Sequence, residues 1–223
     1  YSHARNFLYM ISGTVPDDFV EKVFDASLIL YAEHDYNAST FTTRVTASTL
    51  ADIHSAAISG ICALKGSLHG GAMEKAMEML LAIGEEERVE EWVREALLRK
   101  ERIMGFGHRV YKKGDPRALI MKRFCEQLGE KKGTPKWYRM SLKIEEIMEK
   151  EKGLYPNVDF YAGSAYYMMG IPIELYTPIF TLSRITGWSA HIIEQHDNNR
   201  LIRPMSEYTG PERQGYIPID GRG

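Results

Sequence analysis

The sequence predicts an all-α protein. Three observations support this fold class: helical periodicity runs through almost every ordered stretch, an N-cap acceptor followed by proline recurs, and strand patterns are nearly absent. The acceptor–proline pairs are Asp115-Pro116, Thr134-Pro135 and Thr177-Pro178. Each predicts a helix start, because proline at the first helical position gives up an N–H that has no partner there. Only residues 215–219 have a pattern that could pair as a strand.

Residues 2–10 and 17–31 are the first helical segments along the chain. The chain begins with Tyr1 rather than methionine, and residues 2–10 read as the middle of a helix, so we expect that an N-terminal portion is missing from this chain. Residues 17–31 place side chains on one stripe at helical spacing, which predicts a core helix. That stripe consists of Phe19, Val20, Val23, Phe24, Ser27, Leu28 and Tyr31.

Small residues dominate residues 39–64. They recur at every fourth position, at Ala47, Ala51, Ser55, Ser59 and Ala63. A face of small side chains lets helices approach closely, so we expect one helix buried between others or at a subunit interface. Near the other end of the chain, residues 178–196 predict a second core helix through the apolar stripe Ile179, Leu182, Ile185, Ile192 and Ile193.

Residues 74–152 are charged and strongly amphipathic, whereas the segments on either side are rich in small and aromatic residues. This contrast predicts two domains. A smaller domain is expected at residues 71–170, and a larger one is formed by residues 1–70 and 171–223, with its N-terminal part missing from this chain. The length of 223 residues suffices for one large or two modest domains.

The composition is that of an ordinary globular protein, with 44% hydrophobic and 26% charged residues. A formal net charge of −2 gives no electrostatic reason to expect binding to nucleic acid or to a membrane, and the longest apolar runs are too short to span a bilayer. Cys62 and Cys125 lie far apart among apolar or helix-forming neighbours. We therefore expect buried thiols in a reducing compartment and a cytoplasmic protein without a signal peptide.

Three loop segments concentrate histidine, glycine and charge. In the first, residues 65–72, His69 stands among glycines directly before a helix that is expected to begin near Met73. The positive end of a helix dipole disfavours imidazolium, so a neutral His69 could donate a hydrogen bond to a carbonyl and stabilise an enolate. The alternative is a plain glycine-rich turn whose histidine faces solvent.

The second segment, residues 104–117, places His108 and several basic residues between two predicted helices. Its Gly-x-Gly exposes backbone amides and its cations suit a phosphate or a carboxylate, so we expect an anionic ligand. No strand precedes it, and the glycine spacing does not fit a dinucleotide fingerprint or a P-loop. A solvated basic loop is the alternative.

The third segment, residues 155–164, has Asp159 at the start of a predicted helix, followed by Phe160 and Tyr161. Aromatic neighbours would partly desolvate the carboxylate and raise its basicity, which suits it to remove a weakly acidic carbon-bound proton. A helix-capping aspartate is the alternative.

Two further residues are weaker candidates. His34 lies between two acids at a helix end and is either a ligand contact or a structural histidine. Arg184 lies within an otherwise apolar helix, where a buried arginine favours a carboxylate partner. No pair of histidines has metal-ligand spacing beside a suitable acid, so no metal site is expected.

Together these segments resemble the citrate synthase family. Five motifs occur in the family's order, and the resemblance covers the whole chain: HDYNAST at residues 34–40, LHGG at 68–71, GFGHRVYKKGDPR at 105–117, NVD at 157–159 and RP at 203–204. The resemblance implies a mostly helical homodimer in which a small inserted domain closes over a large one, with oxaloacetate and acyl-CoA in the cleft. It implies condensation of acetyl-CoA with oxaloacetate and water to give citrate and CoA, the entry step of the tricarboxylic acid cycle, without a cofactor.

The resemblance also implies roles for single residues. Asp159 would remove a methyl proton from the acyl-CoA, His69 would hydrogen-bond the thioester oxygen, and His108 would polarise the oxo group under attack. The substrate carboxylates would be held by His34, Arg117, Arg184 and Arg203, with Arg203 reaching the site of the partner subunit. Contacts to CoA would come from Met104, Gly105, Phe106, Gly107, Lys112 and Lys150.

Two departures from the family pattern lie beside His69: Met73 stands where asparagine is usual, and Ser67 stands where proline is usual. A 2-methylcitrate synthase, with propionyl-CoA as the donor, is an alternative. A catalytically silent helical dimer module is a second alternative, although the catalytic and carboxylate-binding positions are all present. A thiolase-like acyltransferase is disfavoured, because neither cysteine lies in a loop with a basic partner.

Overall fold

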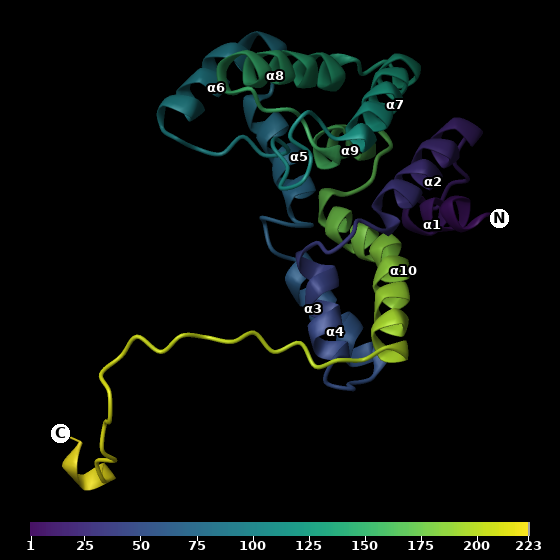
Figure 1. Cartoon of the computed structure of the whole chain (residues 1–223). Helices are drawn as coiled ribbons and strands as arrows, with labels where there is room; N and C mark the ends of the chain where they lie inside the picture. Colours follow the sequence, from purple (N-terminus) through teal and green to yellow (C-terminus); the bar gives the residue numbers. More distant parts are fainter. Residues whose placement is uncertain (223) are drawn as a thin grey trace.

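The computed structural model describes residues 1–222, and its regular elements are all helices (Figure 1). No strand occurs in these residues, so the predicted all-α fold is confirmed. The α-helices are α1 (His3–Ser12), α2 (Asp18–Ala32), α3 (Ala38–Ala47), α4 (Ile53–Leu64), α5 (Ala72–Ile83), α6 (Val89–Leu98), α7 (Pro116–Lys132), α8 (Lys136–Lys152), α9 (Val158–Met168) and α10 (Tyr176–Asp197). The 3-10 helices are η1 (Glu86–Arg88), η2 (Ile173–Leu175) and η3 (Ile219–Gly221). The strand that the sequence allowed at residues 215–219 does not form.

Two of the three predicted acceptor–proline helix starts are found. α7 begins directly after Asp115, whose side chain accepts a backbone N–H of the first turn. α8 begins at Lys136, one residue later than predicted, and its N-cap is Pro135 without a side-chain hydrogen bond, so Thr134 does not cap this helix. The start predicted at Thr177 is wrong, because α10 already begins at Tyr176, immediately after η2. There Oε1 of Glu74 in α5 accepts the N–H of Thr177 at 3.2 Å and so takes the place of a local cap.

The first two helices have side-chain caps. Ser2 accepts the N–H of Arg5, so residues 2–10 contain a helix start and not only a helix interior. Asp17 caps α2 by accepting two backbone N–H groups. The predicted stripe of α2 is confirmed at its centre, since the buried residues of this helix are Val20, Val23, Phe24, Ser27 and Tyr31.

The single helix predicted within residues 39–64 is wrong, because the chain forms α3 and α4 with a turn between them. Leu50 adopts a positive φ of 65° in this turn, and Asp52 caps α4. Two helices do approach closely here, since a Cβ built on Gly60 would lie 2.6 Å from Cγ2 of Thr43. The approach is not made by the predicted face, because Ser55 is exposed and the buried residues of α4 are Ala56, Gly60 and Leu64.

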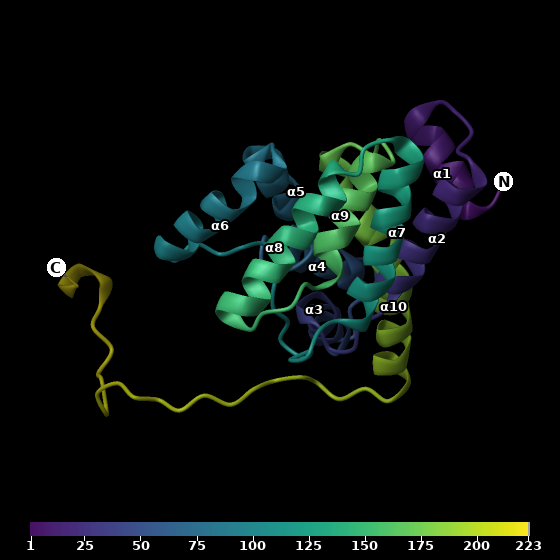
Figure 2. The same cartoon turned by 90° about the horizontal axis from the view of Figure 1, so that it is seen from above.

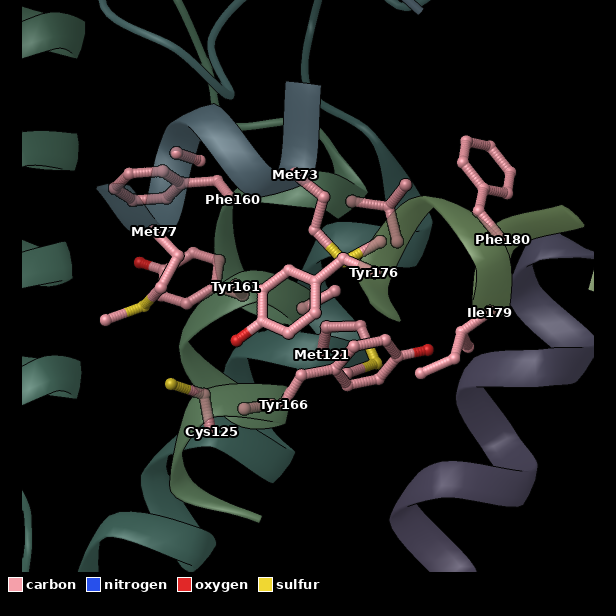
Figure 3. Packing of buried hydrophobic residues seen from close by; sticks show 14 of the residues in the cluster. Met73, Met77, Met121, Cys125, Phe160, Tyr161, Tyr166, Tyr176, Ile179 and Phe180 are labelled. Atoms are coloured by element: carbon pink, nitrogen blue, oxygen red, sulfur yellow. The ribbon is translucent and has the colours of Figure 1, made fainter. Parts of the chain in front are cut away.

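α5, α7, α8 and α9 pack against one another with α6 on α8, while α10 packs against α2, α3 and α4 (Figure 1, Figure 2). Buried apolar side chains of α5, α7, α9 and α10 form one cluster (Figure 3). Gly163 of α9 lets α5 approach, since a Cβ there would lie 3.2 Å from the carbonyl oxygen of Met73. The division into residues 71–170 and the flanking segments stays a prediction.

The two cysteines differ in burial. Cys125 lies in the core cluster, and burial raises the pKa of its thiol, as expected for a buried cysteine. Cys62 is exposed, so the predicted burial of this thiol is wrong. The inner face of α4 consists of Ala56, Gly60 and Leu64, and position 62 lies off that face.

After α10 the chain leaves the helical body as an extended tail that contains Arg203 (Figure 1). Ser48 holds the start of the tail, because its backbone carbonyl accepts from the side chain of Asn199 and its hydroxyl accepts the N–H of Ile202. Within residues 1–222, no helix combines the length and the apolar composition needed to cross a bilayer.

Candidate active site

One cavity of about 440 Å³ brings together most of the predicted catalytic and carboxylate-binding residues. Residues of the loop after α2, the loop before α5, the loop before α7, the start of α9 and one face of α10 line it. The predicted site residues among them are His34, His69, Gly107, His108, Arg117, Asp159 and Arg184. Segments that are far apart in sequence therefore meet at one site.

Asp159 lies in the first turn of α9, but it is not the helix cap. Asn157 caps this helix by accepting the N–H of Asp159 at 3.1 Å, which contradicts the alternative of a capping aspartate. The hydroxyl of Tyr31 donates to Oδ1 of Asp159 at 2.8 Å. Burial raises the pKa of Asp159 to about 6, although the Tyr31 hydrogen bond and the charge of Arg117 act in the opposite direction. The carboxylate is therefore a stronger base than an exposed aspartate.

His69 lies in the loop before α5, as predicted, with its ring held from one side. Its Nε2 accepts the backbone N–H of Ser39 at 3.3 Å and lies 2.8 Å from Oγ of the same serine. A neutral ring whose Nε2 accepts carries its proton on Nδ1, which has no protein partner within residues 1–222. Burial, and then the charges of Arg184 and His34, lower the pKa of His69 to about 4. His69 is therefore a neutral hydrogen-bond donor in this cavity.

His108 is oriented by its own loop. Its Nδ1 accepts the backbone N–H groups of Val110 at 3.0 Å and Tyr111 at 3.1 Å, so the neutral ring carries its proton on Nε2. That Nε2 lies 3.2 Å from Nε2 of His34. Burial lowers the pKa of His108, and the charges of Arg117 and Lys112 act in the same direction. A second neutral donor thus lines the cavity.

Glycine lets the loop before α7 approach the start of α9. Gly105 has a positive φ of 84°, and a Cβ there would lie 2.7 Å from Cβ of Phe160. The backbone of the loop is tied down, because Gly107 N–H donates to the carbonyl of Tyr155 at 2.9 Å and Asn157 N–H donates to that of Gly105 at 2.8 Å. These contacts fix His108 relative to Asp159.

The two cavity arginines differ in their partners. Arg117 makes a two-pronged contact to Asp115, from Nε at 3.0 Å and from Nη2 at 2.8 Å. Arg184 is 1% exposed and donates through Nε to the carbonyl of Tyr31 at 2.7 Å, while its Nη1 has no partner within residues 1–222. Burial, and then the charge of Arg117, lower the pKa of Arg184 to about 10. A buried cation without a carboxylate partner indicates a site for an anionic ligand.

His34 lies between these groups. Its ring stacks on that of Tyr111 at 5.4 Å between centroids. Burial, and then the charges of Arg117 and His108, lower the pKa of His34 to about 4. It is thus a neutral group that faces both His108 and the arginines.

A second cavity of about 620 Å³ adjoins the first and shares Leu68, Ala72, Gly107 and Asn157 with it. Met104, Gly105, Phe106 and Gly107 line this second cavity, and their contact to CoA stays a prediction. Its cationic residues are Lys100, Arg102 and Lys152, which the sequence analysis did not select.

Three of the predicted binding residues are not among the lining of either cavity. Lys150 lies in the last turn of α8, two positions before Lys152, and Lys112 donates to the carbonyl of His108 at 3.3 Å. Arg203 is exposed in the C-terminal tail, where its Nη1 lies 3.6 Å from Sδ of Met205.

Within residues 1–222, no group of three or more His, Cys, Asp or Glu side chains is placed to hold a metal ion.

Comparison with known proteins identifies the family. The citrate synthase C-terminal domain family matches residues 1–205. Citrate synthase 2 of Bacillus subtilis is 54% identical over 222 residues, which cover 100% of this chain and 60% of that protein. The citrate/2-methylcitrate synthase of the same organism is 52% identical over 214 residues, which cover 96% of this chain and 58% of that protein. The chain thus spans about 60% of the length of these relatives.

A solved structure gives the same relationship. Citrate synthase of Thermoplasma acidophilum, in a ternary complex with carboxymethyl coenzyme A and oxaloacetate, superposes with a TM-score of 0.91 at 40% identity. The match covers 99% of this chain and 60% of that chain. The sequence motifs, the helical fold and the similarity over the whole of this chain agree, and the chain belongs to the citrate synthase family.

Proposed function

We propose that the full-length protein condenses acetyl-CoA with oxaloacetate and water to give citrate and CoA. The observation that carries this proposal is one cavity in which the raised-pKa carboxylate of Asp159, the neutral donors His69 and His108, and the unpaired Arg184 meet. This set matches what carbon–carbon bond formation from a thioester requires: a base, a donor for each developing oxyanion, and a cation for the acceptor's carboxylate.

In the first step, Asp159 takes a proton from the methyl carbon next to the thioester carbonyl. The electron pair of the broken C–H bond moves into the enolate, whose oxygen accepts a hydrogen bond from Nδ1 of His69. A neutral imidazole suits this role, because its N–H can polarise the carbonyl and the lowered pKa of His69, about 4, keeps the ring neutral.

In the second step, the enolate carbon attacks the ketone carbon of oxaloacetate. The ketone oxygen becomes an alkoxide, to which Nε2 of His108 donates its hydrogen bond and then its proton. Water hydrolyses the resulting citryl thioester and releases CoA as the free thiol. Asp159 releases the proton that it took and Nε2 of His108 regains one, both by exchange with water, so the two residues return to their starting states. The sequence then balances without an oxidant or a reductant.

We place the oxaloacetate carboxylates against Arg184 and Arg117, with His34 beside them. In a homodimer, Arg203 on the extended tail would complete the site of the partner subunit. The acyl-CoA would occupy the second cavity, next to the backbone of residues 104–107. Residues 71–170 would close as a small domain over this cleft, which would exclude water during the condensation.

Propionyl-CoA is the second candidate donor, which would make the protein a 2-methylcitrate synthase. The observation that favours this second donor is the 52% identity to a relative that is named for both activities. The catalytic residues have the same roles with either donor, because only the substituent on the attacking carbon differs. A silent helical module is disfavoured by the complete catalytic set in one cavity.

The test is release of free CoA thiol by the full-length protein in the presence of oxaloacetate and either acyl-CoA. We expect release to depend on oxaloacetate, and the ratio of the two kcat/KM values names the preferred donor. If the folded protein releases no thiol from either donor, the proposal is wrong, and the alternative of a catalytically silent helical module applies.

A further prediction concerns the cations of the second cavity. Lys152→Glu is expected to raise the KM for the acyl-CoA by about 3–10-fold, because it replaces attraction to phosphate by repulsion at an exposed position. The KM for oxaloacetate should not change. The effect should shrink as ionic strength increases, since salt screens exposed charges.

Lys150→Glu is the matched control, because Lys150 lies in the same turn of α8 but not among the residues that line the cavity. Steady-state kinetics of both variants at low and at high salt are the measurement. Equal effects of the two variants would contradict a specific contact of Lys152.

A further inference from the structure

Tyr31 contacts two of the site's charged residues at once. It lies in the last turn of α2, is 1% exposed, and packs its ring against Phe180 at 4.5 Å between centroids. Its hydroxyl donates to Oδ1 of Asp159 at 2.8 Å, and its backbone carbonyl accepts Nε of Arg184 at 2.7 Å. The helical pattern of residues 17–31 predicts a core position for this tyrosine and no part in the chemistry.

We propose that Tyr31 is a positioning residue for the base: its hydroxyl fixes Oδ1 of Asp159, turns Oδ2 toward the substrate, and favours the ionised carboxylate. This inference rests on the proposed function, in which Asp159 removes the methyl proton. Within residues 1–222, no protein group hydrogen-bonds Oδ2, and this atom is not sealed from solvent. Tyr31 therefore divides the two carboxylate oxygens into one that is held and one that is available to take a proton.

Contacts between α2 and α10 make Tyr31 a rigid anchor. Ser183 of α10 donates its hydroxyl to the carbonyl of Leu28, one turn before Tyr31. A Cβ built on Gly187 would lie only 2.4 Å from the carbonyl oxygen of Ala32. The helices α10 and α2 are therefore too close together here for any residue other than glycine at position 187. α10 therefore contacts α2 both before Tyr31, at Leu28, and after it, at Ala32. These contacts hold the backbone of Tyr31 in place, so the Tyr31 hydroxyl has little freedom to move away from Asp159.

The other groups that face Asp159 leave Tyr31 as its one direct side-chain donor within residues 1–222. The start of α7 contributes Asp115 and Arg117, and α10 contributes Arg184. α5 faces α9 through uncharged side chains such as Met73. α8 contributes Glu145, whose carboxylate accepts a hydrogen bond from the hydroxyl of Tyr161 on α9 and not from a group next to Asp159. Burial raises the pKa of Tyr31 well above its usual value, so the phenol stays protonated and remains a donor.

Tyr31→Phe in the full-length protein tests the proposal, because phenylalanine keeps the ring packing and the backbone carbonyl but removes the hydroxyl. A hydrogen bond to a charged group contributes enough to move a pKa by about 1–2 units. We therefore expect the acidic limb of the kcat/KM profile to move to higher pH by about one unit or more. The KM for oxaloacetate should stay within about twofold, because the carbonyl contact to Arg184 remains.

Tyr176→Phe is the matched control, because Tyr176 is also fully buried but donates its hydroxyl to the carbonyl of Gly163, away from Asp159. Its acidic limb should coincide with that of the wild type. A general structural effect of losing a buried phenol would move both limbs.

A second readout does not depend on turnover. NMR of protein labelled with 13C at the aspartate carboxyl carbon, with Asp159→Asn to assign the signal, follows the titration of Asp159 directly. The midpoint should rise in Tyr31→Phe and stay unchanged in Tyr176→Phe. If Tyr31→Phe does not fold, 3-fluorotyrosine at position 31, a stronger donor of the same shape, should lower the midpoint.

These outcomes separate the two proposals. If the wild type is active but the change at position 31 moves neither the acidic limb nor the NMR midpoint, the proposed role of Tyr31 is wrong. A wild type without condensation activity overturns the proposed function, whereas the NMR midpoint still reports whether Tyr31 sets the ionisation of Asp159.

Discussion

Asp159→Asn is expected to reduce kcat by about 10³-fold or more while oxaloacetate still binds, because an amide of the same shape cannot accept the methyl proton. The amide oxygen can still accept the Tyr31 hydrogen bond, so the geometry of the cavity is retained. The measurement pairs steady-state kcat with the Kd of oxaloacetate from calorimetry. A variant that keeps more than about a tenth of the wild-type kcat would remove Asp159 from the role of base.

The same substitution is expected to stabilise the fold above pH 6. The folded-state pKa of Asp159, about 6, lies above its ordinary value of 3.8, so the native state holds this proton more tightly than the unfolded chain does. The protonated group therefore contributes stability at low pH, and this contribution is lost as the pH rises through about 6. A shift of about two units corresponds to at most ~3 kcal/mol in the free energy of unfolding.

Urea denaturation at pH 8 and at pH 5 is the measurement for this part of the prediction. The gain of Asp159→Asn over the wild type should be largest at pH 8 and should shrink at pH 5. Asp25→Asn is the control, because Asp25 is exposed on α2. A gain that is independent of pH would mean that the carboxylate is not strained by burial.

The loop segments that carry the chemistry could be predicted from sequence because their signals are local. Glycines beside His69 and His108, and aromatic neighbours beside Asp159, are consecutive along the chain. The cavity that joins them could not be derived from local patterns, since it depends on how α2, α9 and α10 pack. Tyr31 and Asp159 are 128 positions apart, and only the fold reveals that their side chains meet.

Errors in the sequence analysis arose where tertiary contacts replaced local signals. Thr177 resembled a helix cap, but Glu74 from another helix accepts its N–H, so α10 begins earlier. The small residues of residues 39–64 fitted one buried helix, yet a turn at Leu50 divides them. Lys152 lines the second cavity and Lys150 does not, because the register of α8 against this cavity is set by packing and not by charge. The contact of either lysine with CoA stays a prediction.

Arg184→Met is expected to raise the KM for oxaloacetate by about 10²–10³-fold. Removal of one partner from a buried charged contact weakens binding by roughly 2–5 kcal/mol, and methionine fills the space without replacing the charge. The KM for the acyl-CoA should change much less, because Arg184 lines only the first cavity. Kinetics with each substrate varied in turn provide the measurement.

Thermal unfolding separates this role from a structural one, with Arg117→Met as the contrasting variant. Arg117 neutralises the buried Asp115, so its loss should destabilise the ligand-free protein by about 3–5 kcal/mol. Arg184 has no carboxylate partner within residues 1–222, so Arg184→Met should leave the ligand-free Tm nearly unchanged and abolish the rise that oxaloacetate produces. A large loss of ligand-free stability in Arg184→Met, with the response to oxaloacetate intact, would show that this arginine supports the fold. An unchanged ligand-free Tm together with a lost response to oxaloacetate would instead mean that Arg184 is a buried cation whose charge is neutralised only when the substrate binds.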